Sequence, residues 1–220
     1  ARYSAAVEKP SYTYATGSNA VSLTVEFTLD MSKLPKSAFT DVTAGAWYYD
    51  AVLYAYGKGL MVGTSDTAFG PDMPMTRAML VAVLHRLAGS PSVSGKMPFT
   101  DVEADTWYTE AVLWAYQNDI VAGTSDTTFE PLSNITREQI VAIFSRYTAK
   151  FAPDKAKAAA ELTAFADSAS VSDWAVNDMK WAVAQKIISG SKNAGKFYLL
   201  PQDNASRAQV ATILMQYCAL

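Results

Sequence analysis

The chain has 220 residues, half of them apolar, which is enough to bury a hydrophobic core. Its formal charge of −3 and the lack of a Lys/Arg cluster exclude the basic surface that nucleic-acid binding requires. No apolar stretch reaches the roughly 20 residues of a membrane span, and the single cysteine excludes an internal disulfide. We therefore expect no nucleic-acid partner and no membrane span.

The N-terminal segment, residues 1–38, has the pattern of β structure. Residues 20–31 alternate between apolar and polar side chains, which is typical of a half-buried strand. Tyr12 and Tyr14 precede the turn-forming residues 16–19, so a β-hairpin is expected here. Because a lone hairpin is marginal in water, we interpret this segment as a linker and the tail of a β domain upstream in a longer parent protein.

From residue 39 onward the sequence repeats three times, over residues 39–89 (repeat 1), 99–148 (repeat 2) and 165–220 (repeat 3). Self-similarity of this kind predicts three copies of one supersecondary unit. Repeat 3 is longer in the loop over residues 191–196. The copies share landmarks in the same order: Trp47, Trp107 and Trp174; Gly63, Gly123 and Gly190; Phe69, Phe129 and Phe197; and Arg77, Arg137 and Arg207.

Each repeat predicts two helices, which in repeat 1 are a short one over residues 47–56 and a second one over residues 77–87. The second helices begin after the N-cap residues Thr76, Thr136 and Ser206, and the last two caps are expected to form capping boxes with Gln139 and Gln209. The second helix is apolar nearly all round, which predicts a central position. We expect a mainly α fold in which the three second helices form a central bundle.

These motifs resemble three tandem S-layer homology domains over residues 39–220, through Phe-x-Asp-Val, the Trp, Gly-x-x-Asp, Phe-x-Pro and the Thr-Arg helix start. The resemblance implies a pseudo-threefold trimer and an extracellular location at the cell wall or S-layer. It also implies binding of a secondary cell-wall polysaccharide, often pyruvylated, in grooves between repeats. The chain departs from the family because no arginine motif keeps its final Glu and because the third loop has Lys192–Asn193.

The arginines of the second helices are the first candidate ligand-binding residues. They lie in the first helical turn, where the macrodipole disfavours a cation by roughly 0.3–1 kcal/mol. Guanidinium and helix N-terminus are therefore expected to face an anion together, and the carboxylate of a pyruvate ketal suits a guanidinium fork. The alternative is a structural ion pair with an aspartate of the loops or of the set Asp41, Asp101 and Asp167.

Three further sets complete the candidate site. Trp47, Trp107 and Trp174 are expected to anchor the core, with stacking on a sugar as the alternative. Gly63, Gly123 and Gly190 are expected to supply backbone freedom and to let a ligand approach the main chain. Asp66 and Asp126 are expected to accept from ligand hydroxyls or to brace an arginine.

The loop aspartates lead to two further expectations, one on the arginine of repeat 3 and one on metal binding. Because repeat 3 lacks the loop aspartate, we expect Arg207 to matter less than Arg77 or Arg137. One carboxylate per loop is far short of a calcium site, so no metal is expected.

No catalytic residue or cofactor site is indicated. His85 is the only histidine and has no counterpart in the other repeats, and no Gly-x-Ser-x-Gly motif is present. Equivalent repeated grooves suit multivalent binding to a polymer better than a single active site. We therefore expect a non-enzymatic module that anchors an exported protein to the wall. The alternative is a protein-interaction or S-layer self-assembly module, and self-association through a larger parent protein is left open.

Overall fold

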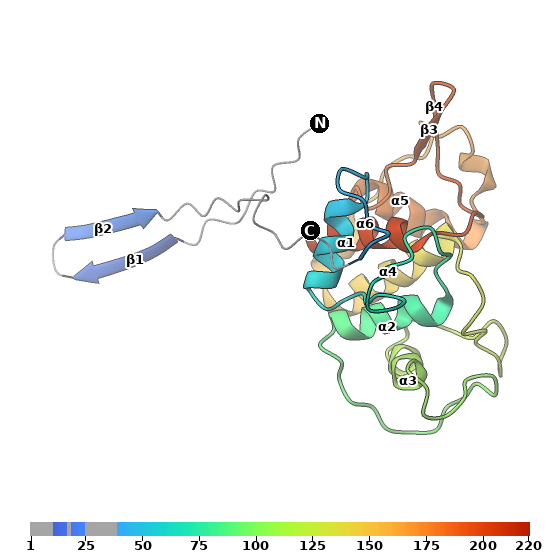
Figure 1. Cartoon of the computed structure of the whole chain (residues 1–220). Helices are drawn as coiled ribbons and strands as arrows, with labels where there is room; N and C mark the ends of the chain where they lie inside the picture. The colour runs from blue at the N-terminus through green and yellow to red at the C-terminus, as the bar shows by residue number, and fades with distance from the viewer. Residues whose placement is uncertain (1–10, 17–18, 25–38) are drawn as a thin grey trace. The chain divides into compact units, whose positions relative to one another are not determined.

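The computed structural model describes residues 11–16, 19–24 and 39–220, and it divides the chain into two units, residues 1–36 and 37–220 (Figure 1). In the first unit, β1 (Ser11–Thr16) pairs with β2 (Asn19–Thr24) in an antiparallel hairpin with Tyr14 opposite Val21. The predicted hairpin is confirmed. The part of the alternating stretch beyond Thr24 lies outside the described residues.

The second unit is mainly helical, as the sequence predicts, and the described part of each repeat contains two α-helices. Repeat 3 also contains a short hairpin of β3 and β4 and 3-10 turns at Ser168–Ser170 and Asp173–Ala175, and a further 3-10 turn at Pro153–Lys157 lies between repeats 2 and 3. The bounds are α1 (Tyr49–Gly57), α2 (Arg77–Leu87), α3 (Thr109–Gln117), α4 (Arg137–Phe151), α5 (Val176–Ala184), β3 (Ser191–Asn193), β4 (Lys196–Tyr198) and α6 (Arg207–Cys218).

The second helix of each repeat begins at its arginine because a hydroxyl side chain caps it. Thr76 accepts from the Met79 N–H at 3.3 Å, and Thr136 and Ser206 form complete capping boxes with Gln139 and Gln209. Such caps satisfy N–H groups that a helix leaves without internal partners. The predicted caps and boxes are confirmed.

Helices pair between repeats. The second helix of one repeat packs against the first helix of the next, α2 against α3 and α4 against α5, and α6 packs against α1. The last pair closes the series on the first repeat. All three repeats therefore contribute to one hydrophobic core.

The loops before the second helices are joined in the same cyclic order. The backbone N–H groups of Arg77, Arg137 and Arg207 donate to Ser133 O, Asp203 O and Met73 O at 3.0, 3.0 and 2.9 Å. Met75, Ile135 and Ala205 form a second ring of N–H···O bonds. Each second helix thus starts on the loop of a neighbouring repeat.

The second helices carry many fully buried side chains. Leu84, Phe144 and Leu214 have no exposed surface, and the Phe144 ring lies 5.0 Å from the ring of Tyr217 in α6. The expected burial of these helices is confirmed. That the three residues meet near a common axis stays a prediction.

Candidate functional site

The three arginines reach from the start of one repeat's second helix into the loop of another repeat. Their Nε atoms donate to buried carbonyls: Arg77 to Phe129 O (2.8 Å), Arg137 to Leu199 O (2.7 Å) and Arg207 to Phe69 O (2.9 Å). The first N–H groups of the same helices bind loop carbonyls as well. The helix N-termini therefore face the partial negative charge of carbonyls, and the expectation that they face a bound anion is wrong for these N–H groups.

Aspartates hold the same loops from the other side. Asp41 accepts from the N–H groups of Phe69 and Gly70 at 2.8 and 2.7 Å, and Asp101 and Asp167 do the same in their repeats. Burial raises the pKa of Asp41, but these N–H bonds outweigh it and the net pKa is lowered. Each loop is thus held by an aspartate of its own repeat and an arginine of another.

The alternative reading, a direct ion pair between one of these aspartates and an arginine, is not found within residues 39–220. Within residues 39–220 the carboxylate–cation pairs within 4.0 Å are Lys150–Asp119 and Lys180–Glu161, both with exposed carboxylates. Burial lowers the pKa of the Arg207 guanidinium, and the charge of Asp41 opposes this shift. Aspartate and arginine therefore make no direct contact. They bind the same loop and interact by longer-range electrostatics.

The structural counterpart of Phe69 and Phe129 in repeat 3 is Leu199, not Phe197. Leu199 is fully buried, its N–H binds Asp167 and its carbonyl binds Arg137. Phe197 lies two residues earlier in β4 and is 45% exposed. The correspondence based on phenylalanine is wrong because the longer loop of repeat 3 displaces the aromatic residue into a hairpin.

This geometry changes the expected ranking of the arginines. The altered loop of repeat 3 contacts Arg137 through Leu199, whereas Arg207 contacts Phe69 in the loop of repeat 1. That Arg207 matters less for binding stays a prediction, but its stated reason does not apply, because the loop that contacts Arg207 is not the altered one. The arginine with the different surroundings is Arg137.

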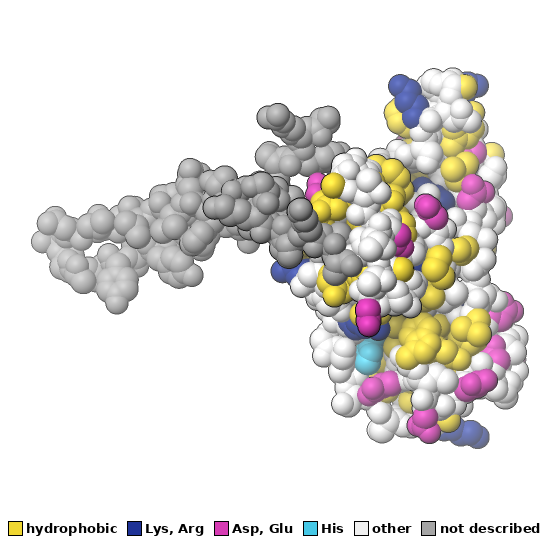
Figure 2. Space-filling view, in the orientation of Figure 1, with side chains coloured by type: hydrophobic (Ala, Val, Ile, Leu, Met, Phe, Trp, Pro, Cys, Tyr) yellow, Lys and Arg dark blue, Asp and Glu magenta, His cyan; other side chains and the backbone are white. Residues whose placement is uncertain are grey.

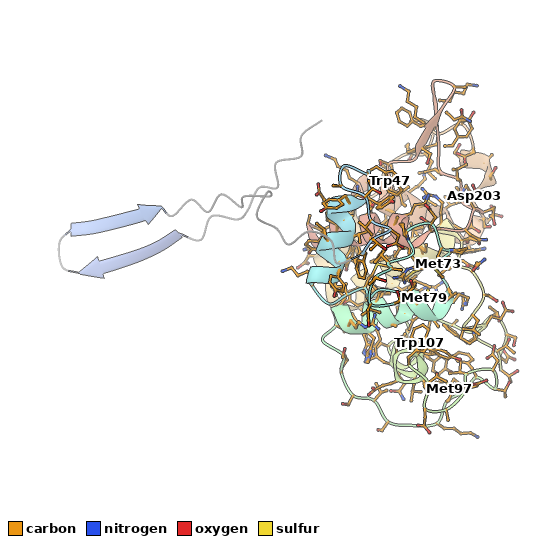
Figure 3. All side chains as sticks on the ribbon, viewed as in Figure 1. Trp47, Met73, Met79, Met97, Trp107 and Asp203 are labelled. Atoms are coloured by element: carbon orange, nitrogen blue, oxygen red, sulfur yellow. The ribbon has the colours of Figure 1, made fainter. Side chains whose placement is uncertain are left out.

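A groove of about 300 Å³ brings predicted site residues from all three repeats together. It is lined by Trp47 of repeat 1, Arg137 of repeat 2, and the following residues of repeat 3: Ile187, Ile188, Ser189, Gly190, Ser191, Gln209, Thr212, Ile213 and Gln216. Figure 3 shows Trp47 beside α1. Among the described residues the Nη atoms of Arg137 have no hydrogen-bond partner, so this edge of the guanidinium is free.

The other two arginines have their second edge partly occupied. Arg77 Nη2 donates to Ala122 O at 3.3 Å, and Arg207 Nη2 donates to Val62 O. Arg77 and Arg207 also lie over the rings of Phe129 and Phe69, each 4.6 Å from the ring centroid. Arg137 lacks such a ring because Leu199 takes its place. Of the three arginines, Arg137 therefore has the fewest side-chain contacts among the described residues.

A second groove, of about 470 Å³, lies on repeat 2 near Arg77. Its lining is Tyr116, Gln117, Asp119, Val121, Ala122 and Arg146. Burial lowers the pKa of Arg77, the carboxylates of Glu130 and Asp101 oppose this, and Arg146 adds to it. Arg146 therefore supplies the positive charge of this groove's lining, close to Arg77.

The sequence reasoning did not identify this second position, although repeat spacing reveals it. Arg86, Arg146 and Gln216 each lie nine residues after the arginine of their own helix. Arg86 donates to Leu60 O at 3.1 Å, and the Gln216 amide, oriented to donate, reaches the equivalent Ile187 O at 2.8 Å. Arg86 lies near Arg207, whose pKa it helps to lower after burial. Arg77 and Arg207 thus each have a second arginine nearby, whereas the groove around Arg137 is lined by a glutamine at the equivalent position.

The three tryptophans are on the surface, and their expected role as core anchors is wrong. Trp47, Trp107 and Trp174 are 66%, 56% and 54% exposed, because each lies before the first helix and not within it. Tyr48 and Tyr108 hold the first two indoles edge-on at 5.3 and 5.0 Å. Hydrophobic side chains reach the surface of this unit in several places (Figure 2). The alternative, a ring available for stacking, is compatible with this exposure.

The predictions for the three glycines are confirmed in part. A Cβ at Gly63 or Gly123 would lie 2.4 or 2.2 Å from a loop carbonyl, so close approach requires glycine there. Only Gly190 also has a positive φ, +75°, so the expected backbone freedom applies to it alone.

Asp66 and Asp126 are exposed, and neither forms an ion pair with an arginine within residues 39–220. They brace no arginine, and acceptance from a ligand stays a prediction.

In the described ranges, 11–16, 19–24 and 39–220, no group of three or more His, Cys, Asp or Glu side chains is placed to hold a metal ion. No helix in these ranges is both long and apolar enough to cross a bilayer.

Comparison with known proteins gives three matches to the S-layer homology domain family, at residues 38–78, 98–141 and 164–211. The chain is 29% identical to an endoglucanase of Bacillus sp. (strain KSM-635) over 83% of its length and 19% of the relative's. It is 30% identical to the surface-layer 125 kDa protein of Lysinibacillus sphaericus over 74% of its length and 13% of the relative's. It is 26% identical to an S-layer protein of Bacillus licheniformis over 46% and 11%.

The chain therefore spans less than a fifth of these relatives, and the enzyme among them matches only over this small share. The family matches fall on the three repeats and account for more than half of the chain. The chain belongs to the S-layer homology domain family, whose place is the cell wall or S-layer at the bacterial surface.

Proposed function

We propose that residues 39–220 form a pseudo-threefold module that anchors an exported protein to the bacterial cell wall without catalysis. In this proposal the module binds a secondary cell-wall polysaccharide in grooves between repeats. The cyclic order of the helix pairs and loop hydrogen bonds supports the threefold arrangement. The matches to three tandem S-layer homology domains support the anchoring role.

The observation that carries the proposal is the groove around Arg137. A free guanidinium edge and an exposed indole lie in one concave surface, contributed by different repeats. A guanidinium recognises a carboxylate by two parallel hydrogen bonds, and an indole face packs on the apolar face of a sugar ring. Together these groups suit an anionic sugar, such as one with a pyruvate ketal, better than a neutral one.

The near-repetition of arginine, tryptophan and glycine supports a polymeric ligand. A polysaccharide presents the same sugar at intervals, so a second groove binds at a high effective concentration once the first is occupied. Weak individual grooves then give firm attachment. Multivalent binding of this kind does not require the three grooves to have equal affinities.

The test is sedimentation of the protein with purified bacterial walls before and after chemical removal of the secondary polysaccharide. Binding should be lost with the polymer and should be weakened, but not abolished, by 1 M salt, where the Debye length falls to about 3 Å. Binding that survives removal of the polymer would instead favour the alternative, a protein-interaction or self-assembly module. Trp47→Ala is the informative variant, because its exposed ring can be removed with little loss of packing.

A further inference from the structure

The β3–β4 hairpin distinguishes repeat 3 from the other repeats. Repeats 1 and 2 have a tight loop here, in which the N–H groups of Thr64 and Thr124 donate to Ala68 O and Thr128 O, each at 2.8 Å. Repeat 3 instead forms a hairpin around Ala194 and Gly195, both with positive φ, as a two-residue hairpin turn requires. The hairpin projects from the helices (Figure 1), and lysine side chains lie at its tip (Figure 2).

This hairpin continues a wall of the Arg137 groove. Ser189, Gly190 and Ser191 line the groove, and Ser191 is the first residue of β3. The chain therefore passes from the groove directly into the hairpin, and a ligand longer than the groove meets the hairpin next.

The two faces of the hairpin carry different side chains. Because successive residues of a strand alternate in direction, Ser191 shares its face with Asn193 and with Lys196, which is paired with Asn193. Lys192 and Phe197 are paired on the other face, with the Lys192 ammonium 5.8 Å from the ring centroid. Asn193 and Lys196 are exposed and form no side-chain hydrogen bond among the described residues.

The charge of this region complements an anionic ligand. The sequence has four lysines and no acidic residue between Asp178 and Asp203, in a chain whose net charge is −3. The Arg137 groove also lacks the second arginine, since Gln216 stands where the other repeats have Arg86 and Arg146. A lysine of the hairpin that continues from Ser191 would supply the missing second cation.

We propose that the β3–β4 hairpin extends the Arg137 groove into a longer site, in which Lys196 and Asn193 contact the next sugar of an anionic polysaccharide. The inference rests on the proposed function. The ammonium group pairs with an acidic substituent of that sugar, and the Asn193 amide bonds a hydroxyl. Repeat 3 thereby binds a longer stretch of polymer than the tight loops of repeats 1 and 2.

The test compares two lysines of the same hairpin. Secondary polysaccharide released from the purified bacterial walls of the sedimentation test is separated into single-unit and longer fragments and titrated calorimetrically against the whole chain. Lys196→Ala should lower the affinity for longer fragments about two- to five-fold, the usual effect of one exposed charge pair. Affinity for single units should not change. Lys192→Ala, on the opposite face, is the matched control and should behave as wild type.

The outcomes separate the two proposals. If the wild-type chain binds no fragment of any length, the proposed function fails and the inference fails with it. If the wild type binds but Lys196→Ala binds longer fragments equally well, only the hairpin's role is refuted. An equal loss in Lys192→Ala, or a loss for single units, also overturns the extended site, because general charge attraction then explains the effect. Thermal melting of each variant should match wild type, since both side chains are exposed.

Discussion

Replacing each of the three arginines by alanine should destabilise the fold by different amounts, in the order Arg207 and Arg77 above Arg137. The Arg207 side chain donates one hydrogen bond to a buried carbonyl and one to a part-buried carbonyl, and it lies over the Phe69 ring; Arg77 has the same set of contacts with repeat 2. Among the described residues, the Arg137 side chain donates one hydrogen bond, to Leu199 O. The comparison keeps the residue type, helix position and burial nearly constant.

The magnitudes follow from these contacts. A hydrogen bond to a charged group contributes about 1.5–3 kcal/mol, and a partly desolvated cation–π contact about 0.5–2 kcal/mol. These terms are not additive, so we expect a loss of about 3–5 kcal/mol for Arg207→Ala or Arg77→Ala and about 1.5–3 kcal/mol for Arg137→Ala. Urea unfolding followed by circular dichroism measures the loss, with exposed Lys58→Ala as a control that should stay within about 0.5 kcal/mol.

The result that contradicts this reasoning is a loss for Arg137→Ala equal to or larger than that for Arg207→Ala. Such a result would mean that carbonyl and ring contacts do not decide the role of these arginines. If the order holds, Arg137 is the arginine whose alanine variant remains folded enough for binding measurements. Loss of wall binding in that variant then reports on the ligand and not on unfolding.

Three other predictions concern stability. Phe144→Ala should cost about 3–5 kcal/mol in urea unfolding because the ring is fully buried, and a loss near zero would rule out its central position. Lys186→Gly should raise the melting temperature, gaining about 1 kcal/mol, since Lys186 has φ +59° where repeat 1 has Gly59 at +68°; an unchanged or lower value would contradict the strain. The pKa of Asp41 is lowered in the fold, so its contribution is present above the ordinary value of 3.8 and is lost as pH falls through the folded value. Asp41→Asn should therefore flatten the acid limb of the stability–pH curve, and an unchanged limb would count against this linkage.

Local features of the fold could be predicted from the sequence because the residues that determine them are neighbours in the chain. The N-cap of the second helix is a hydroxyl directly before the arginine, and the capping glutamine follows three residues later, as in Thr136 and Gln139. The β1–β2 hairpin likewise depends on adjacent turn residues. No distant contact has to be known for these predictions.

Predictions that depend on distant contacts were less successful. Phe197 was matched to Phe129 by residue type, but the carbonyl that binds the arginine belongs to Leu199, because a hairpin had formed between them. The sequence predicts a core position for Trp47 because it stands at the start of an apolar helix, yet it precedes α1 and is exposed. The hydrophobicity of a tryptophan does not determine whether a neighbouring repeat covers it in the folded protein.

The cyclic contacts explain why comparing repeats with each other does not reveal the site. Trp47, Arg137 and Gly190 line one groove, although they occupy different positions in three different repeats. An alignment of repeats puts Arg137 beside Arg77 and Arg207, whereas the structure puts it beside a loop of the next repeat. Differences between grooves therefore arise from combinations of repeats. A change in one loop, such as the hairpin of repeat 3, should be tested at the arginine of the preceding repeat.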